Sequence, residues 1–197
     1  MSQPPAIAGL ILAAGASERM GFDKALANHH GRSFLETIIT RLREASLERL
    51  AVVLGHHADQ IQQAVDLSGV QVVVNREYHL GQTSSLRAGL RALESQNLDA
   101  IVLCLVDHPT VASSTIRQLI HGYLESRSAV VVPTFKGRRG HPVILTRELF
   151  DSLAALPPGR GANSVVRQYS AQTLAVAVDD PGVVLDINDP QMLAQLG

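Results

Sequence analysis

The stretch that decides the fold is Leu10-Ile-Leu-Ala-Ala-Gly-Ala-Ser-Glu-Arg-Met-Gly-Phe-Asp-Lys24. An apolar run that ends in small residues is typical of a buried strand feeding a tight loop. The small residues let backbone N–H groups approach an anion closely, and Arg19 and Lys24 add full positive charge. The stretch therefore predicts a polyphosphate-binding loop. A plain strand-to-loop junction with two solvated cations is the alternative, but the loop is long for a simple connection.

The composition of the whole chain limits the class of protein. The 197 residues suffice for one sizeable core, so we expect a single domain over residues 1–197. No apolar stretch approaches the ~20 residues that span a bilayer, and the N-terminus does not resemble a signal peptide. The single cysteine, Cys104, has no partner for an intramolecular disulfide, and its apolar surroundings predict a buried thiol. These features predict a cytoplasmic protein.

The charge balance restricts the partners of the chain. A formal net charge of −1 argues against general binding to nucleic acid or to a membrane surface, since both favour broad basic patches. An anionic ligand must then be held by a local cluster of cations, which agrees with the polyphosphate loop.

Short apolar runs alternate with amphipathic stretches along the first two thirds of the chain. The expected strands, apolar almost throughout as in a parallel sheet buried on both faces, are residues 6–12, 50–54, 70–74, 100–105 and 129–133. The expected helices are residues 34–45, 58–66, 83–94 and 113–125, the first opened by a capping box of Ser33 and Glu36. This order predicts an α/β fold with a doubly wound, mostly parallel sheet, which binds ligands beyond the carboxyl ends of its strands.

The pattern changes after residue 133. A turn-rich basic segment covers residues 134–142, and shorter elements follow. The expected strands here are residues 143–145, 174–178 and 183–185, and the expected helices are residues 147–154, 162–169 and 190–196. We interpret this part as a small antiparallel addition to the same sheet.

Asp107 directly follows the apolar run 100–105 and is the first candidate metal ligand. A carboxylate at the end of a buried strand, beside a polyphosphate loop, suits Mg²⁺, which takes few carboxylates plus phosphate oxygens. The alternative is that Asp107 caps the helix expected from Ser113. Further along, Asp186 or Asn188 could complete the oxygen shell if that segment returns to the same strand ends, although the segment also has the form of a common strand–helix turn. Its next residue, Asp189, is the expected helix cap.

The segment 75–85 is a candidate site for a nucleobase or ribose. Gly81 permits close approach, and Ser84 and Ser85 offer hydroxyl groups and helix N-terminal amides. One of Thr83 and Ser84 is the expected helix cap.

The histidines are numerous but badly spaced for a metal cage. The pairs at 29–30 and 56–57 are adjacent in sequence, so we expect their side chains to diverge, which disfavours a zinc site. His141 lies in the basic segment, where it could meet an anionic substrate together with Lys136, Arg138 and Arg139. A solvated basic hairpin is equally compatible with that composition.

Several nucleotide and hydrolase motifs are missing from the chain. The spacing of Gly15 and Gly21 does not fit the P-loop, and there is neither a G-x-G-x-x-G fingerprint nor a G-x-S-x-G elbow. These absences disfavour P-loop kinases, dinucleotide-dependent dehydrogenases and serine hydrolases.

Taken together, the motifs resemble those of the nucleotidyltransferases that include sugar-phosphate and molybdenum-cofactor enzymes. The signature matches at residues 12–24 and continues in order through Asn75 and residues 81–90, 105–109, 139–142 and 186–190. The combination most resembles the molybdenum cofactor cytidylyltransferase branch of the MobA-like family, in which Gly-His-Pro and Asp-x-Pro motifs occur together. Residues 158–163 and 188–189 depart from the usual family pattern.

The resemblance implies a Rossmann-like nucleotidyltransferase fold and a role for each matching residue. The triphosphate would be bound by Leu12, Ala13, Ala14, Gly15, Ser17, Arg19 and Lys24. The base and ribose pocket would be lined by Asn75, Gly81 and Ser85. Mg²⁺ would be held by Asp107 with Asn188, catalysis would rest on Arg19, Lys24 and Asp107, and Arg139 and His141 would face the acceptor. An alanine at position 14 matches the form of the loop associated with cytidine.

The implied activity is transfer of CMP from CTP to a molybdopterin-type molybdenum cofactor, with release of pyrophosphate. A molybdenum hydroxylase apo-enzyme is a conceivable further partner. Three alternatives stay open at this point. The acceptor could be a sugar or alcohol phosphate, the chain could be a non-catalytic carrier or chaperone for the cofactor, or it could be a nicotinamide-dependent oxidoreductase.

Overall fold

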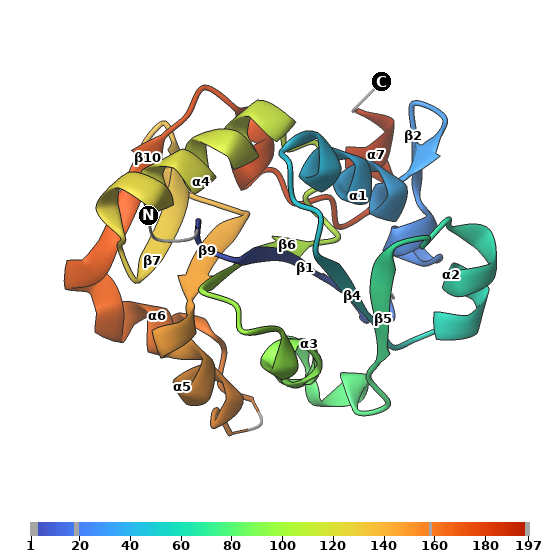
Figure 1. The fold of residues 1–197 in the computed structure, drawn as a ribbon. Coiled ribbons are helices and arrows are strands. Elements are labelled where there is room, and N and C mark those ends of the chain that lie inside the picture. The colour runs from blue at the N-terminus through green and yellow to red at the C-terminus, as the bar shows by residue number, and fades with distance from the viewer. Residues whose placement is uncertain (1–3, 18–19, 158, 196–197) are drawn as a thin grey trace.

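The computed structural model describes residues 4–17, 20–157 and 159–195. A sheet in the order β10-β7-β9-β6-β1-β4-β5, with β8 paired to β7, runs through the centre (Figure 1). Its strands are β1 (Ile7–Ala13), β4 (Leu50–Leu54), β5 (Val70–Val74), β6 (Ala100–Leu105), β7 (Val130–Phe135), β8 (Arg138–Arg139), β9 (Val143–Thr146) and β10 (Thr173–Ala177). A separate hairpin is formed by β2 (Asn28–His29) and β3 (Arg32–Ser33).

The sheet is mostly parallel, as predicted. Strand β1 pairs in parallel with both β4 and β6, and β10 pairs in parallel with β7. The short strand β9 is antiparallel to both β6 and β7 and lies between them. Because β9 runs against β6, it starts beside the carboxyl end of β6, with Val143 opposite Leu103. The expected doubly wound α/β fold and its antiparallel addition are confirmed.

Helices cover both faces of the sheet. The helices are α1 (Phe34–Glu44), α2 (Ala58–Ala64), α3 (Gln82–Leu93), α4 (Ser113–Ser126), α5 (Phe150–Ala154), α6 (Asn163–Val166) and α7 (Pro190–Ala194). Figure 1 shows α1 and α4 on one face and α3, α5 and α6 on the other. None of the helices that the structure describes is long and apolar enough to cross a membrane.

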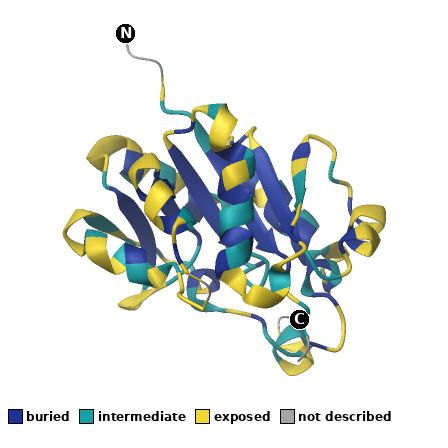
Figure 2. Cartoon of the chain, turned by 90° about the horizontal axis from the view of Figure 1, so that it is seen from below, coloured by how far each residue is buried: buried dark blue, intermediate teal, exposed yellow. Residues whose placement is uncertain are grey.

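Two apolar cores, one on each face, explain why the central strands β1, β4 and β6 are hydrophobic throughout. Along β1, Ile11 and Ala13 pack into one core, whereas Leu10 and Leu12 pack into the other. This alternation follows from the two-residue period of a strand. Figure 2 shows the consequence: the central strands are buried, and exposed residues lie on the outer surfaces of the helices.

The start of α1 confirms the capping box predicted from sequence. The hydroxyl of Ser33 accepts a hydrogen bond from the N–H of Glu36, and the Glu36 carboxylate accepts one from the N–H of Ser33. By contrast, the cap expected for α3 is wrong, because Gly81 occupies the N-cap position. There Thr83 instead donates to the carbonyl of Arg160, at 2.6 Å, and Ser84 donates back to Gly81 and Glu77.

The strand expected at residues 183–185 is also wrong. The chain forms a 3-10 turn, η7 (Pro181–Val184), because the side chain of Asp180 accepts a hydrogen bond from the N–H of Gly182 and Pro181 fixes the turn. Two expected helices are shorter than predicted. Residues 147–154 begin as a 3-10 turn, η5 (Arg147–Leu149), and α6 gives way to another, η6 (Arg167–Gln172).

Candidate active site

A cleft of about 230 Å³ opens where β1 and β6 end. Three segments of the chain line it: the loop after β1, the start of α3, and the end of β6. The lining residues are Leu12, Ala14, Gly15, Ser17, Lys24, Tyr78, Gly81, Gln82, Ser85, Leu105, Val106 and Asp107. This position, beyond the carboxyl ends of parallel strands, is the usual ligand position in open α/β sheets.

The loop after β1 holds a shape that leaves its backbone open to a ligand. Ser17 adopts a left-handed conformation with φ of 53°, and its hydroxyl accepts a hydrogen bond from the N–H of Lys24, at 3.1 Å. Apart from Gly15 itself and its two chain neighbours, no described atom lies within 4 Å of the point where a Cβ on Gly15 would stand. The carbonyl of Ala14 accepts the N–H of His56, which fastens the loop to the end of β4. Arg19, a predicted triphosphate ligand, lies outside the described residues.

Lys24 brings together the two predicted metal ligands. Its Nζ donates a hydrogen bond to Oδ1 of Asn188, at 2.6 Å, and lies 3.8 Å from Oδ2 of Asp107. The Lys24 side chain is only 13% exposed, so the ion pair with Asp107 is screened less than a surface pair. A partly buried cation between two oxygen-bearing side chains is a suitable partner for a phosphate chain.

The segment that carries Asn188 is fixed to the end of β6 by its backbone. The N–H of Ile187 donates to the carbonyl of Asp107, at 2.8 Å. The Ile187 side chain is fully buried in a small cluster with Met20, Ala27 and Phe34. The segment therefore docks simultaneously on the loop after β1 and on the end of β6. Asp189 caps α7 as predicted, accepting the N–H of Met192.

One oxygen of the Asp107 carboxylate, Oδ1, is buried and is not engaged in a hydrogen bond with the residues that the structure describes, although Nε2 of His108 lies 4.0 Å from it. The cap of α4 is Ala112, not Asp107. The amide oxygen of Asn188 accepts the hydrogen bond from Lys24, and its amide nitrogen donates to the carboxylate of Asp186. The oxygens of these side chains are hard donors, as Mg²⁺ prefers, so the residues present fit such an ion.

Asn75 does not line the cleft but supports the residues that do. The side chain is 6% exposed, and its amide nitrogen donates to the hydroxyls of Ser84 and Ser85, at 2.9 and 3.0 Å. Its amide oxygen accepts the N–H of Glu77. Ser85 lines the cleft, and Gly81 beside it has φ of 93°, with no described atom near its Cβ position.

The two predicted acceptor residues lie in different surroundings. Arg139 is exposed on β8 and contributes to the lining of neither the cleft nor the hollow beside it. His141 lines that second, small and mostly apolar hollow, together with Cys104, His108 and Pro142. Burial, and then repulsion from His108, lower the pKa of His141 to about 4, so its ring is neutral at pH 7. Its ring centroid lies 5.2 Å from that of His108.

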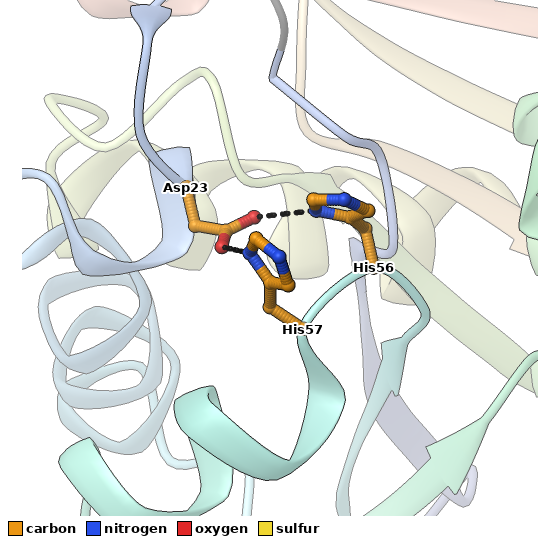
Figure 3. Close-up of side chains that lie close together, drawn as sticks. All are labelled: Asp23, His56 and His57. Carbon is orange, nitrogen blue, oxygen red and sulfur yellow. Dashed lines mark hydrogen bonds and ion pairs between the residues drawn. The ribbon is translucent and has the colours of Figure 1, made fainter.

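The expectation that adjacent histidines diverge is wrong. The ring centroids of His29 and His30 are 4.0 Å apart, and those of His56 and His57 are 3.7 Å apart. His57 has φ of 51°, a left-handed conformation, and its ring and that of His56 both face Asp23 (Figure 3). A strand or helix geometry, which the prediction assumed, does not apply at this junction.

Some of the lining residues were not singled out in the sequence. Tyr78 and Gln82 lie within the segment 75–85, which the sequence predicts to be near the ligand, but no sequence feature distinguishes these two residues from their neighbours. Leu105 and Val106 directly precede Asp107 and share its strand end. Cys104 is buried as predicted, and its burial raises the thiol pKa to about 12, so it carries no reactive thiolate at neutral pH.

The fold and the cleft together define an α/β protein of the nucleotide-binding class, with its ligand site at strand ends. Comparison with known families makes the class specific. A profile of the MobA-like NTP transferase domain matches residues 9–174, and the chain belongs to that family.

Individual relatives differ in the activities their names give. The chain is 30% identical to nicotine blue oxidoreductase of Paenarthrobacter nicotinovorans, over 98% of this chain and 97% of that one. It is also 30% identical to a probable molybdenum cofactor guanylyltransferase of Rhodopirellula baltica, over 66% of this chain and 61% of that protein. Among solved structures, Rv0371c of Mycobacterium tuberculosis H37Rv superposes with a TM-score of 0.86 at 29% identity, covering 99% and 98% of the two chains.

Proposed function

We propose that the protein transfers CMP from CTP to the terminal phosphate of a molybdopterin-type molybdenum cofactor and releases pyrophosphate. The observation that carries this proposal is the position of Lys24, which lies between Asp107 and Asn188 and lines the cleft beside the loop after β1. Family membership supports nucleotidyl transfer. The cytidine and the cofactor rest on the sequence resemblance.

The chemistry needs positioning more than it needs a strong base. The acceptor phosphate is already anionic, so its oxygen attacks the α-phosphorus of CTP, and the bond from that phosphorus to the bridging oxygen of pyrophosphate breaks. The open backbone of Ala14 and Gly15 and the ammonium of Lys24 hold the triphosphate and offset the charge that builds on the leaving pyrophosphate. Mg²⁺, held by Asp107 with Asn188 or Asp186, would neutralise and orient phosphate oxygens.

The direct test is pyrophosphate release from CTP, GTP, ATP and UTP, with and without molybdenum cofactor. The expected result is release that requires both CTP and the cofactor, together with a dinucleotide form of the cofactor as product. Asp107→Asn, which keeps the shape of the side chain, is expected to lose most of the activity. Cofactor-independent release, or equal rates with all four nucleotides, would contradict the proposal.

Ala14 tests the choice of base separately from the chemistry. Ala14 lines the cleft and is 4% exposed. We expect Ala14→Gly to enlarge the pocket and to raise the rate with GTP relative to CTP, by roughly ten-fold or more, a contact worth about 1–3 kcal/mol. An unchanged ratio of the two rates would remove Ala14 as the determinant.

The acceptor is tested by a panel of phosphates. The decisive result is a sugar phosphate or an alcohol phosphate that supports CTP-dependent pyrophosphate release better than the molybdenum cofactor does. That result would support cytidylyl transfer and would contradict the molybdenum cofactor as its acceptor.

A second candidate activity is favoured by one relative. The chain aligns with 97% of the length of nicotine blue oxidoreductase, so an oxidoreductase acting on a similar dye is a real alternative. It would oxidise NADH or NADPH while the dye is reduced, which absorbance at the wavelengths of the nicotinamide and the dye follows directly. Turnover of a nicotinamide together with no pyrophosphate release from any nucleotide would favour this candidate.

A further inference from the structure

Outside the cleft, three metal-ligating side chains converge on one point (Figure 3). Nδ1 of His57 lies 2.6 Å from Oδ2 of Asp23, and Nδ1 of His56 lies 3.6 Å from Oδ1 of the same carboxylate. One ligand atom from each of the three residues lies within 4.8 Å of the other two. Within residues 4–17, 20–157 and 159–195, no other group of three histidine, cysteine or carboxylate side chains meets this condition.

The backbone explains the convergence. Asp23 lies between the loop after β1 and the turn η2 (Lys24–Leu26), and it is 7% exposed. His56 and His57 follow the end of β4, where the left-handed conformation of His57 begins α2. None of the three lines the cleft. The cluster thus lies where the loop after β1 and the end of β4 meet.

The donor set favours a transition metal over Mg²⁺. Two imidazole nitrogens and one carboxylate oxygen are a common zinc set, whereas the oxygens around Asp107 suit a hard cation. Tetrahedral zinc with bonds of about 2.0–2.1 Å separates its ligand atoms by roughly 3.3 Å. Nδ1 of His56 lies 3.6 Å from Oδ1 of Asp23, close to that value, whereas Nδ1 of His57 lies 2.6 Å from Oδ2, so the His57 ring has to move by roughly 0.7 Å for both rings and the carboxylate to bind one ion.

Two further observations point to a missing ligand. Nδ1 of His56 is buried and makes no hydrogen bond to any residue that the structure describes, which is costly unless another partner satisfies it. The His57 side chain is 54% exposed, so an ion can approach the cluster from solvent on that side.

From this geometry we propose a zinc-class metal site formed by Asp23, His56 and His57, with water as the fourth ligand. When the metal binds Nδ1 of each histidine, the remaining imidazole proton lies on Nε2. The hydrogen bond from His57 to Asp23 is then replaced by one bond from His57 to the metal and one from Asp23 to the metal. His56 donates its N–H to Ala14, at the start of the loop after β1, and Asp23 adjoins Lys24, at its end. The metal therefore fastens both ends of this loop to β4. This assignment does not depend on which reaction the cleft catalyses.

The test uses untagged, full-length, metal-free protein. Titration with Co²⁺ is expected to give the visible absorption of a four-coordinate site at one ion per chain, and Zn²⁺ is expected to displace it while excess Mg²⁺ is not. Three near-isosteric variants remove one ligand each: Asp23→Asn, His56→Phe and His57→Asn. Asparagine is chosen at position 57 because it tolerates the left-handed conformation. Each is expected to weaken Zn²⁺ binding by at least about ten-fold, since even outer-shell changes cost that much.

His30→Asn is the matched control. His30 also belongs to an adjacent pair and also has positive φ, 52°, but it is outside the three-ligand group. This variant is expected to bind Zn²⁺ as the wild type does, and circular dichroism checks that all variants are folded. Hydrogen exchange of residues 13–26 is expected to slow with Zn²⁺ in the wild type but not in His57→Asn. Wild-type Zn²⁺ affinity in folded Asp23→Asn and His57→Asn, or equal loss in His30→Asn, would overturn the site; unchanged exchange would overturn the fastening of the loop.

Discussion

The ammonium group of Lys24 connects segments that are far apart in the chain, because its partner Asn188 lies 164 positions away. Under the proposed activity, Lys24→Ala removes a preorganised charge from the leaving pyrophosphate. Loss of one such donor typically costs about 3 kcal/mol, which corresponds to roughly a hundredfold or more in kcat. Pyrophosphate release measures the loss, and circular dichroism confirms that the variant is folded. Near-wild-type release by Lys24→Ala would contradict the role given to this residue.

His141 makes a prediction about pH and stability. The unfolded chain binds a proton at His141 below about pH 6.5, whereas burial lowers the folded pKa to about 4. Between these values the unfolded state holds more protons, so the free energy of unfolding falls as the pH falls from 6.5 toward 4. The full contribution is of order 3 kcal/mol. Urea unfolding at pH 7, 6, 5 and 4 measures it.

The control for this prediction is His141→Gln, which cannot titrate. Other histidines also titrate in this range, so the informative quantity is the difference between the two stability curves. The free energy of unfolding of the wild type minus that of His141→Gln is expected to fall as the pH falls from 6.5 to 4. Parallel curves for the wild type and His141→Gln would show that the histidine stays protonatable in the folded state.

The start of α4 depends on a side chain from a distant loop. Oδ2 of Asp180 accepts hydrogen bonds from the N–H of Ala112 and the hydroxyl of Thr115, at 2.9 and 2.6 Å, while Oδ1 accepts the N–H of Gly182. Asp180→Ala leaves all three donors without this partner. We expect it to lower the free energy of unfolding by about 2 kcal/mol, as loss of a good cap does. Chemical denaturation measures the change.

Asp179→Ala is the matched control, because Asp179 is the neighbouring carboxylate and is exposed. Its effect is expected to stay within about 0.5 kcal/mol, as for ordinary surface substitutions. Equal destabilisation by the two variants would mean that Asp180 acts through charge alone and not through its three hydrogen bonds.

The predictability of the elements varied with how much each depends on local sequence. Strands β4, β5 and β6 have the predicted bounds: β4 and β6 are runs of five and six consecutive apolar residues, and β5 has four valines around Gln71, so few alternatives fit. The capping box of α1 is also local, and it was predicted correctly. The strand expected at 183–185 failed because its turn is set by Asp180, whose carboxylate also reaches across to α4.

The same distinction applies to the candidate site. The loop after β1 and Asp107 were predicted from their position after apolar runs, and both line the cleft. Asn75 was expected in the pocket, but its amide is consumed by Ser84, Ser85 and Glu77, which only the folded backbone reveals. The convergence of His56 and His57 on Asp23 depends on the positive φ angle of His57 and on its contact with Asp23, 34 positions away. Neither feature produces a periodic sequence pattern from which it could be predicted.

At the level of the whole molecule, a ligand that binds only the folded state must stabilise it. Saturating CTP at about 100 times its Kd would add about 2.7 kcal/mol, which for a chain of this size is roughly 5–10 °C in Tm. If Asp107 recruits Mg²⁺ to the triphosphate, most of this gain is expected to vanish when EDTA replaces Mg²⁺, and in Asp107→Asn with Mg²⁺ present. A full shift in EDTA would show that the metal plays no part in nucleotide binding.

The hydrogen bond between Ile187 and Asp107 also dictates when Asn188 can reach Lys24. The ribosome makes Asp107 first and reaches Ile187 about 80 residues later, which takes roughly ten seconds at ordinary rates of synthesis. During that interval the first strands can pair, but Lys24 has no Asn188 to bind. A nascent chain would therefore form its sheet before these two contacts, and a polypeptide stalled between these positions would be partly folded and would lack both of them.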